Sequence, residues 1–109
     1  MEANYAKQRI INDIETNDIK IQVTGFVKEK KDNEEFILDD KSGQIRVLAS
    51  NIEKKIPEVD DLVNVFGELE IKTNGEKVLN AYIIQDMNKL RLICKSIVVK
   101  ENLGIFYYC

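Results

Sequence analysis

Residues 36–47 read FILDDKSGQIRV, and this stretch decides the fold of the chain. On each side of its middle, apolar residues recur at every second position, which is typical of half-buried β-strands. These inward positions are Phe36, Leu38, Ile45 and Val47. Between the two runs, Asp39–Gly43 reads as a tight turn, in which aspartates bond their own backbone and Gly43 supplies a permissive φ. The stretch therefore predicts strands over residues 35–38 and 44–49, joined by a short turn.

Strand signals continue on both sides of this unit. Residues 19–28 alternate at period two, with Ile21 and Val23 inward, and predict a first strand that ends in a polar loop at residues 30–34. Residues 62–71 and 78–85 predict a fourth and a fifth strand, joined by an Asn-Gly turn at residues 73–75. Gly25 and Gly67 stand inside strand patterns, which suggests a bulge or a sharp barrel bend.

The order of these segments indicates the fold class. Between the third and fourth strands, residues 51–55 allow about one helical turn, which Pro57 ends. Five strands, this insert and the two glycines fit the five-stranded Greek-key barrel known as the OB-fold, over residues 18–86. An open α+β sandwich is the alternative.

Both ends of the chain are predicted to be helical. Residues 4–14 form a short helix within an N-terminal extension, residues 1–17. After the fifth strand, residues 86–103 contain no glycine or proline, and Gly104 suits the position that follows a helix. The fold class is therefore an all-β barrel followed by a C-terminal helix and tail, residues 87–109. The β-branched run Ile97–Val98–Val99 is the weak point of this helix, because such residues have low helix propensity.

The composition argues against several classes of protein. The chain has 109 residues, enough for one domain with a modest core. No apolar run approaches the roughly 18 residues that cross a membrane, and the first ten residues do not resemble a secretory signal. Histidine, the commonest general base and metal ligand, is absent, so we expect no catalytic set, metal, cofactor or small-molecule substrate. The net charge of −3 argues against tight autonomous binding to nucleic acid.

Four segments resemble, in order, the OB domains of replication protein A subunits. Residues 19–27 resemble the family's I-x-V-x-G-x-V first strand, and residues 36–47 its F-x-L-D-D-x-T/S-G-x-I-x-V segment. Residues 63–67 resemble its V-x-V-x-G fourth strand. Residues 81–90 are similar to the middle-sized subunit in particular, where strand five passes into a C-terminal helix. The resemblance covers residues 8–100.

The resemblance implies a function as well as a fold. That family binds single-stranded DNA and works as a trimer, in which the C-terminal helices form a three-helix bundle between subunits. It implies a role in DNA replication, repair and recombination, with larger and smaller OB-fold subunits as partners. The family's stacking tryptophan corresponds to Leu48 here, and its second stacking aromatic to Ile71–Lys72. Because each aromatic platform contributes ~1–3 kcal/mol per base, we expect weak DNA binding by this barrel.

The outer face of the first three strands is the predicted nucleic-acid surface, since OB barrels bind oligonucleotides there. Basic side chains on this face are candidate phosphate contacts, and two outward apolar side chains complete the set. The candidates are Lys28, Lys30, Lys31, Ile37, Arg46, Leu48, Lys72 and Lys77. The alternative is a solvated charged surface, because residues 28–35 hold three lysines against four acidic residues.

Two further groups of residues have competing interpretations. Phe26, Phe66 and Tyr82 fall at outward strand positions, where they either stack on bases or lie beneath a terminal helix. The pair Asp39–Asp40 suggests a metal site, but the Ser42–Gly43 that follows favours a turn capped by the aspartates. We therefore expect no metal at this pair.

The C-terminal helix is predicted to carry a partner interface. Its apolar stripe contains Leu90, Ile93 and Ile97, with Met87 and Cys94 flanking it, and Val98 outside the stripe completes the predicted interface. Because further apolar residues lie outside the stripe, the helix needs burial on more than one side, which a three-helix bundle provides. The alternative is that the helix packs back on the open end of the barrel.

Three functional hypotheses follow. The first is a non-catalytic subunit of a single-stranded-DNA-binding complex that bridges its partners through the C-terminal helix. The others are a telomere-capping relative and a stand-alone OB module that binds RNA or tRNA. The two cysteines, Cys94 and Cys109, suit a reduced intracellular protein, located in the nucleus if the source is eukaryotic and in the cytoplasm if it is archaeal.

Overall fold

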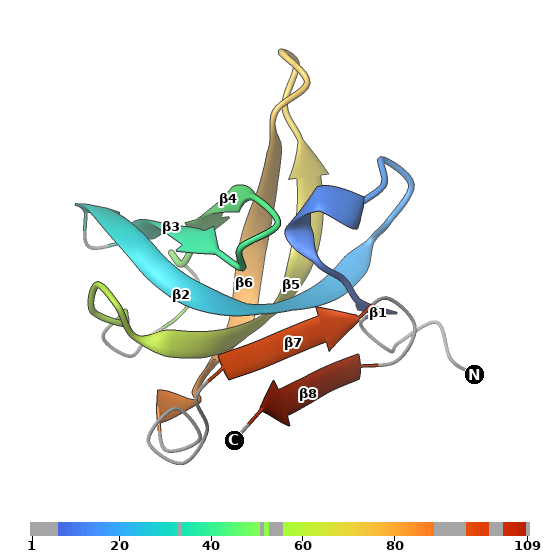
Figure 1. Cartoon of the computed structure of the whole chain (residues 1–109). Helices are drawn as coiled ribbons and strands as arrows, with labels where there is room; N and C mark the ends of the chain where they lie inside the picture. The colour runs from blue at the N-terminus through green and yellow to red at the C-terminus, as the bar shows by residue number, and fades with distance from the viewer. Residues whose placement is uncertain are drawn as a thin grey trace.

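The polypeptide forms a six-stranded sheet, most of which closes into a barrel, and a separate two-stranded sheet (Figure 1). The computed structural model describes residues 7–32, 34–50, 52 and 56–88, and the backbone of residues 96–100 and 104–108. The elements, in chain order, are β1 (Lys7–Gln8), the 3-10 helix η1 (Ile11–Asp13), β2 (Lys20–Asp32), β3 (Glu35–Asp39), β4 (Gln44–Leu48), β5 (Leu62–Ile71), β6 (Lys77–Asp86), β7 (Ser96–Lys100) and β8 (Gly104–Tyr108).

Five of these strands make the barrel wall. Their order is β2-β3-β4-β6-β5, and β2 also pairs with β5, which closes the barrel. All these pairings are antiparallel except that of β4 with β6. At the β2–β5 contact, the buried hydroxyl of Thr24 donates to Oδ1 of Asn64 at 2.9 Å. The predicted closed five-stranded barrel is confirmed.

The predicted strand bounds agree closely with the structure. β5 spans the predicted residues, and the ends of β3, β4 and β6 differ from the prediction by one residue. β2 is longer than predicted and runs to Asp32, through residues expected to form a loop. The cause is pairing: Glu29 and Lys30 lie opposite Ile37 and Phe36 of β3.

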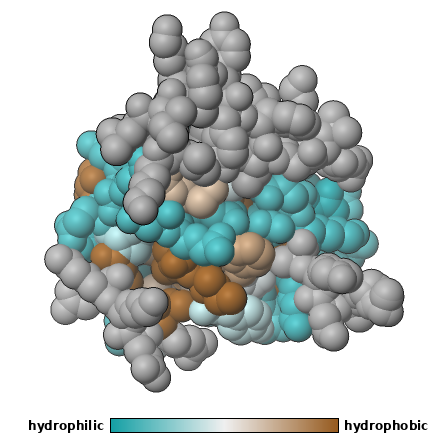
Figure 2. Space-filling model, turned by 90° about the horizontal axis from the view of Figure 1, so that it is seen from below, coloured by the Kyte–Doolittle hydropathy of each residue, from teal (hydrophilic) through white to brown (hydrophobic). Residues whose placement is uncertain are grey.

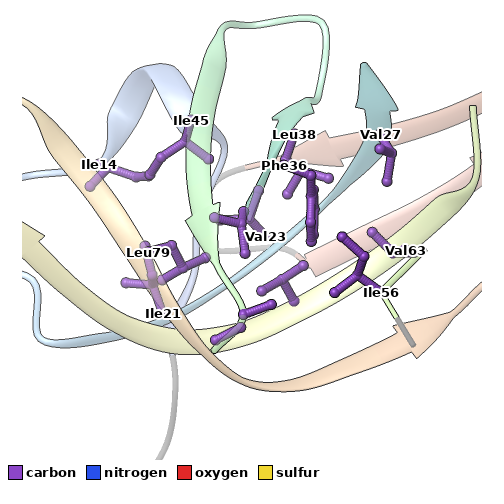
Figure 3. Packing of buried hydrophobic residues seen from close by; sticks show 14 residues of the cluster. Ile14, Ile21, Val23, Val27, Phe36, Leu38, Ile45, Ile56, Val63 and Leu79 are labelled. Atoms are coloured by element: carbon purple, nitrogen blue, oxygen red, sulfur yellow. The ribbon is translucent and has the colours of Figure 1, made fainter. Parts of the chain in front are cut away.

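The barrel interior is filled by aliphatic side chains and one aromatic side chain, as expected from the period-two pattern (Figure 3). The six positions predicted to point inward in the first three strands are all buried: Ile21, Val23, Phe36, Leu38, Ile45 and Val47. β5 and β6 contribute Val63, Val65, Leu79 and Ala81. Burial of this apolar surface is the main term that stabilises the barrel.

Two glycines allow neighbouring strands to approach closely. A Cβ added at Gly25 would lie 2.6 Å from the carbonyl oxygen of Asp39, which is closer than real side chains come. A Cβ at Gly67 would overlap the carbonyl oxygen of Asn80, and the β5–β6 register shifts by one residue at this point. The predicted bulge is therefore present at Gly67, whereas Gly25 allows close strand contact.

The predicted turn between β3 and β4 is formed, with one correction. Oδ1 of Asp40 accepts hydrogen bonds from the amides of Ser42 and Gly43, at 2.9 and 3.2 Å. The residue with a positive φ is Lys41, at 78°, and not Gly43. Oδ1 of Asp39 accepts the amide of Lys41 at 2.7 Å and so holds this conformation.

The predicted N-terminal helix is wrong for the residues that the structure describes. Residues 7–8 form β1, which pairs in parallel with β2, and only Ile11–Asp13 form a 3-10 turn. The amide of Ile11 donates to Oδ2 of Asp40 at 2.7 Å, and the amide of Asn12 donates to Oγ of Ser42 at 3.0 Å. These backbone groups bond to the β3–β4 turn, so they are not available for a helix.

The predicted C-terminal helix is wrong over residues 96–100, which form β7 and pair with β8. Ile97 and Val98, two of the predicted interface residues, therefore lie on a strand opposite Tyr107 and Phe106. The β-branched run explains the difference, because such residues favour extended backbone. The other predicted contacts Leu90, Ile93 and Cys94 lie outside the described residues, as does most of the predicted helical turn at 51–55. Met87 is half-buried, and its amide donates to the carbonyl of Leu62 at 2.8 Å.

Candidate nucleic-acid interface

A groove of about 540 Å³ lies between η1, the β3–β4 pair and the turn of the β5–β6 hairpin. In Figure 1 this hairpin stands away from the other strands of the barrel. Aliphatic side chains from Ile11, Ile14 and Ile37 line part of the groove, and Gln44, Arg46, Glu76 and Lys77 provide its polar groups. The groove thus joins an apolar wall with both a cation and a carboxylate, on the face predicted to bind nucleic acid.

The N-terminal segment forms one wall of this groove. It is fixed at one end by the bonds from Ile11 and Asn12 to the β3–β4 turn. At the other end Nζ of Lys77 donates to the carbonyl oxygen of Ile14 at 2.9 Å. A Cβ at Gly43 would lie 3.3 Å from Cγ2 of Ile11, so glycine at this position leaves room for η1. The wall is therefore held by contacts along its whole length.

The structure brings together three of the eight predicted nucleic-acid contacts. Ile37, Arg46 and Lys77 line the groove, whereas the other five do not. Leu48 is half-buried on β4, opposite Glu35. The remaining four are Lys28, Lys30 and Lys31 on the second half of β2, and Lys72 at the β5–β6 turn. Lys28 lines a separate, smaller hollow with Asp39 and Lys41.

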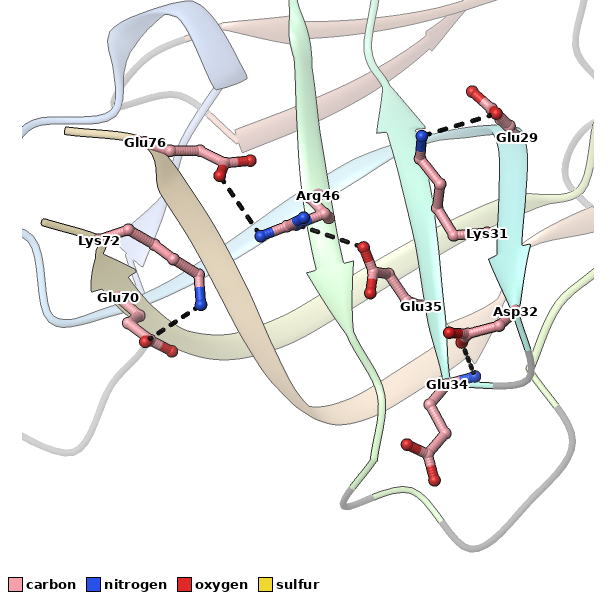
Figure 4. A network of polar contacts seen from close by, with 9 residues as sticks. All are labelled: Glu29, Lys31, Asp32, Glu34, Glu35, Arg46, Glu70, Lys72 and Glu76. Carbon is pink, nitrogen blue, oxygen red and sulfur yellow. Dashed lines mark hydrogen bonds and ion pairs between the residues drawn. The ribbon is translucent and has the colours of Figure 1, made fainter. Parts of the chain in front are cut away.

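Arg46 is the central cation of the groove, and two carboxylates hold it (Figure 4). Its Nη2 lies 3.3 Å from Oε1 of Glu76, and its Nε lies 3.3 Å from Oε2 of Glu35. Its side chain is 29% exposed, so solvent and ligands reach it. A phosphate that binds Arg46 must therefore compete with carboxylates already in place.

Three more of the predicted phosphate contacts are paired with carboxylates. Lys30 pairs with Glu58 at 3.3 Å, Lys31 pairs with Glu29 at 3.7 Å, and Lys72 pairs with Glu70 at 3.7 Å. The side-chain amide of Asn80 donates to Oε1 of Glu70 at 2.8 Å and lowers the pKa of this carboxyl, and the Lys72 charge lowers it further. Glu70 therefore stays ionised and keeps its lysine. The alternative interpretation of a solvated, self-neutralised surface describes these residues better than a free basic patch.

The three outward aromatic residues do not line the groove. Phe26 is half-buried, and Nζ of Lys41 lies 5.7 Å from the centre of its ring. Phe66 is also half-buried. Tyr82 is 46% exposed, and its hydroxyl donates to Oε1 of Glu68 at 2.6 Å, which raises the pKa of the tyrosine. In the described part of the chain, the groove therefore offers aliphatic surface, and not an aromatic ring, to a base.

Sequence reasoning missed several groove residues. Ile11 and Ile14 fall within the predicted helix at residues 4–14, and Gln44 and Glu76 are not among the predicted contacts. The position of Glu76, directly after the Asn74–Gly75 turn, was the available signal, because that turn borders the ligand face of an OB barrel. The pairing of Glu76 with Arg46 joins residues thirty positions apart, which no local pattern indicates.

The described residues contain no group of three or more His, Cys, Asp or Glu side chains arranged to hold a metal ion. Within the same ranges, no helix has the length and apolar character to span a membrane.

Comparison with known proteins supports the fold. No family model matches the sequence, and no curated protein matches it either. Among solved structures, the chain is similar to the hypothetical protein YgiW from E. coli, with 21% identity and a TM-score of 0.50. The match covers 62% of this chain and 74% of that chain. The barrel is an OB-fold. At this level of identity the similarity concerns the fold alone.

Proposed function

We propose that the chain is a non-catalytic OB module that contacts single-stranded DNA through the groove, within a complex similar to replication protein A. The observation that carries this proposal is the position of the groove. It lies on the outer face of β3 and β4, beside the β5–β6 turn, where OB-folds bind oligonucleotides. The ordered sequence resemblance to replication protein A subunits adds the role in DNA replication, repair and recombination.

The groove suits a strand held by its backbone more than by its bases. Arg46 and Lys77 supply cations for phosphate oxygens, and Ile11 and Ile37 supply apolar surface for sugars and base faces. Aliphatic contacts are weaker platforms than aromatic rings, which stack on bases with ~1–3 kcal/mol each. The carboxylate of Glu76 in the same groove repels phosphate. Binding by this chain is therefore weak and sensitive to salt.

The first experiment measures binding of the full chain to a fluorescent oligothymidine of about 20 nucleotides by anisotropy, at about 50 and 200 mM salt. Wild-type chain should bind at the lower salt concentration and lose affinity at the higher one. Arg46→Glu should weaken binding by about tenfold, because it reverses the charge in the groove. Arg46→Gln tests the same contact without adding a third carboxylate beside Glu35 and Glu76.

The matched control is Lys31→Glu, which makes the same charge change at an exposed ion pair outside the groove. Its effect should be less than a third of the Arg46→Glu effect. Equal losses in the two variants would contradict the groove as the site, and no binding by the wild-type chain would contradict the proposal itself. An oligouridine of equal length, which binds better than oligothymidine only if the chain is an RNA module, separates the main alternative.

The subunit role is the second part of the proposal. Exposed apolar side chains support it, since they often mark association surfaces. The large ones among the described residues are Ile19, Val59, Ile71, Tyr82 and Ile83. In the view from below, hydrophobic side chains are visible at the surface beside hydrophilic ones (Figure 2). Co-expression with larger and smaller OB-fold chains of the same genome should give a complex that co-elutes in size-exclusion chromatography. A chain that elutes alone with every such partner would refute this part.

A further inference from the structure

The environment of Arg46 suggests how strongly the groove holds a strand, and this inference rests on the proposed function. The guanidinium faces two carboxylates, so one cation stands against two anions (Figure 4). Both contacts are 3.3 Å long, beyond the usual length of a strong charge-assisted hydrogen bond. Nε of Arg46 is buried and makes no hydrogen bond to any described residue. Arg46 is therefore held by one long hydrogen bond to Glu76 and by the charge of Glu35, without a bidentate contact to either carboxylate.

Glu76 is the carboxylate placed to compete with a ligand. It lines the groove, whereas Glu35 approaches Arg46 from β3 and does not line it. The β5–β6 turn fixes the backbone of Glu76. The backbone amide of Glu76 donates to Oδ1 of Asn74 at 2.9 Å, and the backbone carbonyl of Glu76 accepts the Lys72 amide at 2.8 Å. Its side chain is 41% exposed, so it can turn away from Arg46 into solvent.

We infer that Glu76 is an affinity-setting residue, which competes with a nucleic-acid phosphate for the guanidinium of Arg46. In the free protein the carboxylate occupies the place that a phosphate oxygen takes in the complex. A phosphate that binds must displace Glu76 and then remains near its negative charge. The groove consequently binds single strands loosely and releases them readily, which suits a module that contributes little DNA affinity to a larger complex.

The test compares Glu76→Gln with the wild-type full chain in the oligothymidine anisotropy assay, over a series of salt concentrations. Glutamine keeps the size of the side chain and removes its charge. Since exposed ion pairs are modest, the variant should bind about threefold to fivefold more tightly. The plot of log affinity against log salt should also become steeper by about 0.7, because one more phosphate is neutralised without a competing carboxylate. The double variant Arg46→Gln with Glu76→Gln should lose the gain.

Glu34→Gln is the matched control, because it removes one negative charge from the β2–β3 turn and does not touch the groove. It should change affinity by less than half as much as Glu76→Gln. Circular dichroism and thermal unfolding of each variant confirm that the barrel is intact.

The outcomes separate this inference from the proposed function. Wild-type binding that Arg46→Gln weakens but Glu76→Gln leaves unchanged would refute the role of Glu76 and leave the groove as the binding site. If Glu76→Gln and Glu34→Gln increase the affinity for oligothymidine equally, the role of Glu76 is refuted as well, since the change in net charge alone would explain the increase. Wild-type binding that becomes tighter in Glu76→Gln but not in Glu34→Gln would support it. No binding by any variant at low salt would overturn both.

Discussion

At the residue scale, the ion pair of Arg9 and Asp18 ties the N-terminal segment to the barrel. Nη2 of Arg9 lies 2.9 Å from Oδ1 of Asp18, and the two side chains are only 9% and 2% exposed. Oδ2 of Asp18 accepts the amide of Glu15 at 2.9 Å. Both carboxylate oxygens are thus satisfied, so the pair is stable although its burial costs solvation of both charges.

Removing one partner should leave an uncompensated buried charge. We expect Arg9→Ala to lower the free energy of unfolding by about 3 kcal/mol, as measured by urea denaturation. Lys31→Ala serves as the control, because its pair with Glu29 is exposed and should contribute less than about 1 kcal/mol. Similar losses in the two variants would show that Arg9 and Asp18 are not buried together in solution.

At the element scale, β2 is the strand that holds the barrel together. Its first half pairs with β5 and its second half pairs with β3, and Gly25 lies where the strand passes from one neighbour to the other. The carbonyl of Asp39 occupies the space where a side chain would begin at this position. A Cβ at Gly25 would thus meet backbone atoms, which can move aside less easily than the end of a flexible side chain.

Gly25→Ala should therefore destabilise the protein by about 2–3 kcal/mol in urea denaturation, since the strands must move apart. Gly43→Ala is the comparison, because its new methyl group meets Cγ2 of Ile11 at 3.3 Å, a side-chain atom at a longer distance than the backbone contact of Gly25. We expect a loss below about 1 kcal/mol for this second variant. If Gly25→Ala were the milder change, the close approach of β2 and the β3–β4 turn would be wrong.

The sequence predicts elements well where one local pattern determines them. Period-two alternation places the barrel strands within one residue at most ends, because one face of each strand is buried. The helix predicted at residues 4–14 is wrong at Ile11 and Asn12, because their backbone amides bond to Asp40 and Ser42, about thirty positions along the chain. The predicted C-terminal helix is likewise wrong at Ile97–Val99. The absence of glycine and proline favours a helix there, but the β-branched side chains favour a strand.

At the scale of the whole molecule, the fold pairs four of the basic side chains predicted to contact phosphate with carboxylates: Lys30, Lys31, Arg46 and Lys72. The sequence shows which residues are basic, but only the fold shows that Arg46 meets Glu76 of the β5–β6 turn. For the same reason the sequence placed Lys28, Lys30 and Lys31 at the interface, although they do not line the groove. A candidate site made of long-range contacts is therefore predicted from sequence only in part.

Besides the exposed Glu70, two carboxyls with lowered pKa values make stability depend on pH. Burial raises the pKa of Asp18, but the Arg9 guanidinium and the Glu15 amide outweigh it and hold the pKa below the ordinary value of 3.8. The Lys41 amide likewise lowers the pKa of Asp39. The pKa of each carboxyl is lower in the folded state than in the unfolded state. At pH values between these two pKa values the unfolded chain binds more protons, so the free energy of unfolding rises with pH over this range.

We therefore expect the urea midpoint to be steady above about pH 5 and to fall as the pH drops below 3.8. Asp18→Asn, which cannot titrate at this position, should show a shallower fall over the same range. Identical slopes for the variant and the wild-type chain would mean that the pKa of Asp18 is the same in the folded and unfolded states.

The closing of the barrel between β2 and β5 has a kinetic consequence. Thr24 and Asn64, which meet at this contact, are forty positions apart in the chain. Bringing such distant segments together costs conformational entropy before the favourable contacts form, so folds with long-range pairings form slowly. During synthesis the first half of β2 emerges from the ribosome early and must wait for β5. Until then this strand exposes Ile21 and Val23 together with an unpaired edge, and it is the segment where a chaperone would act first.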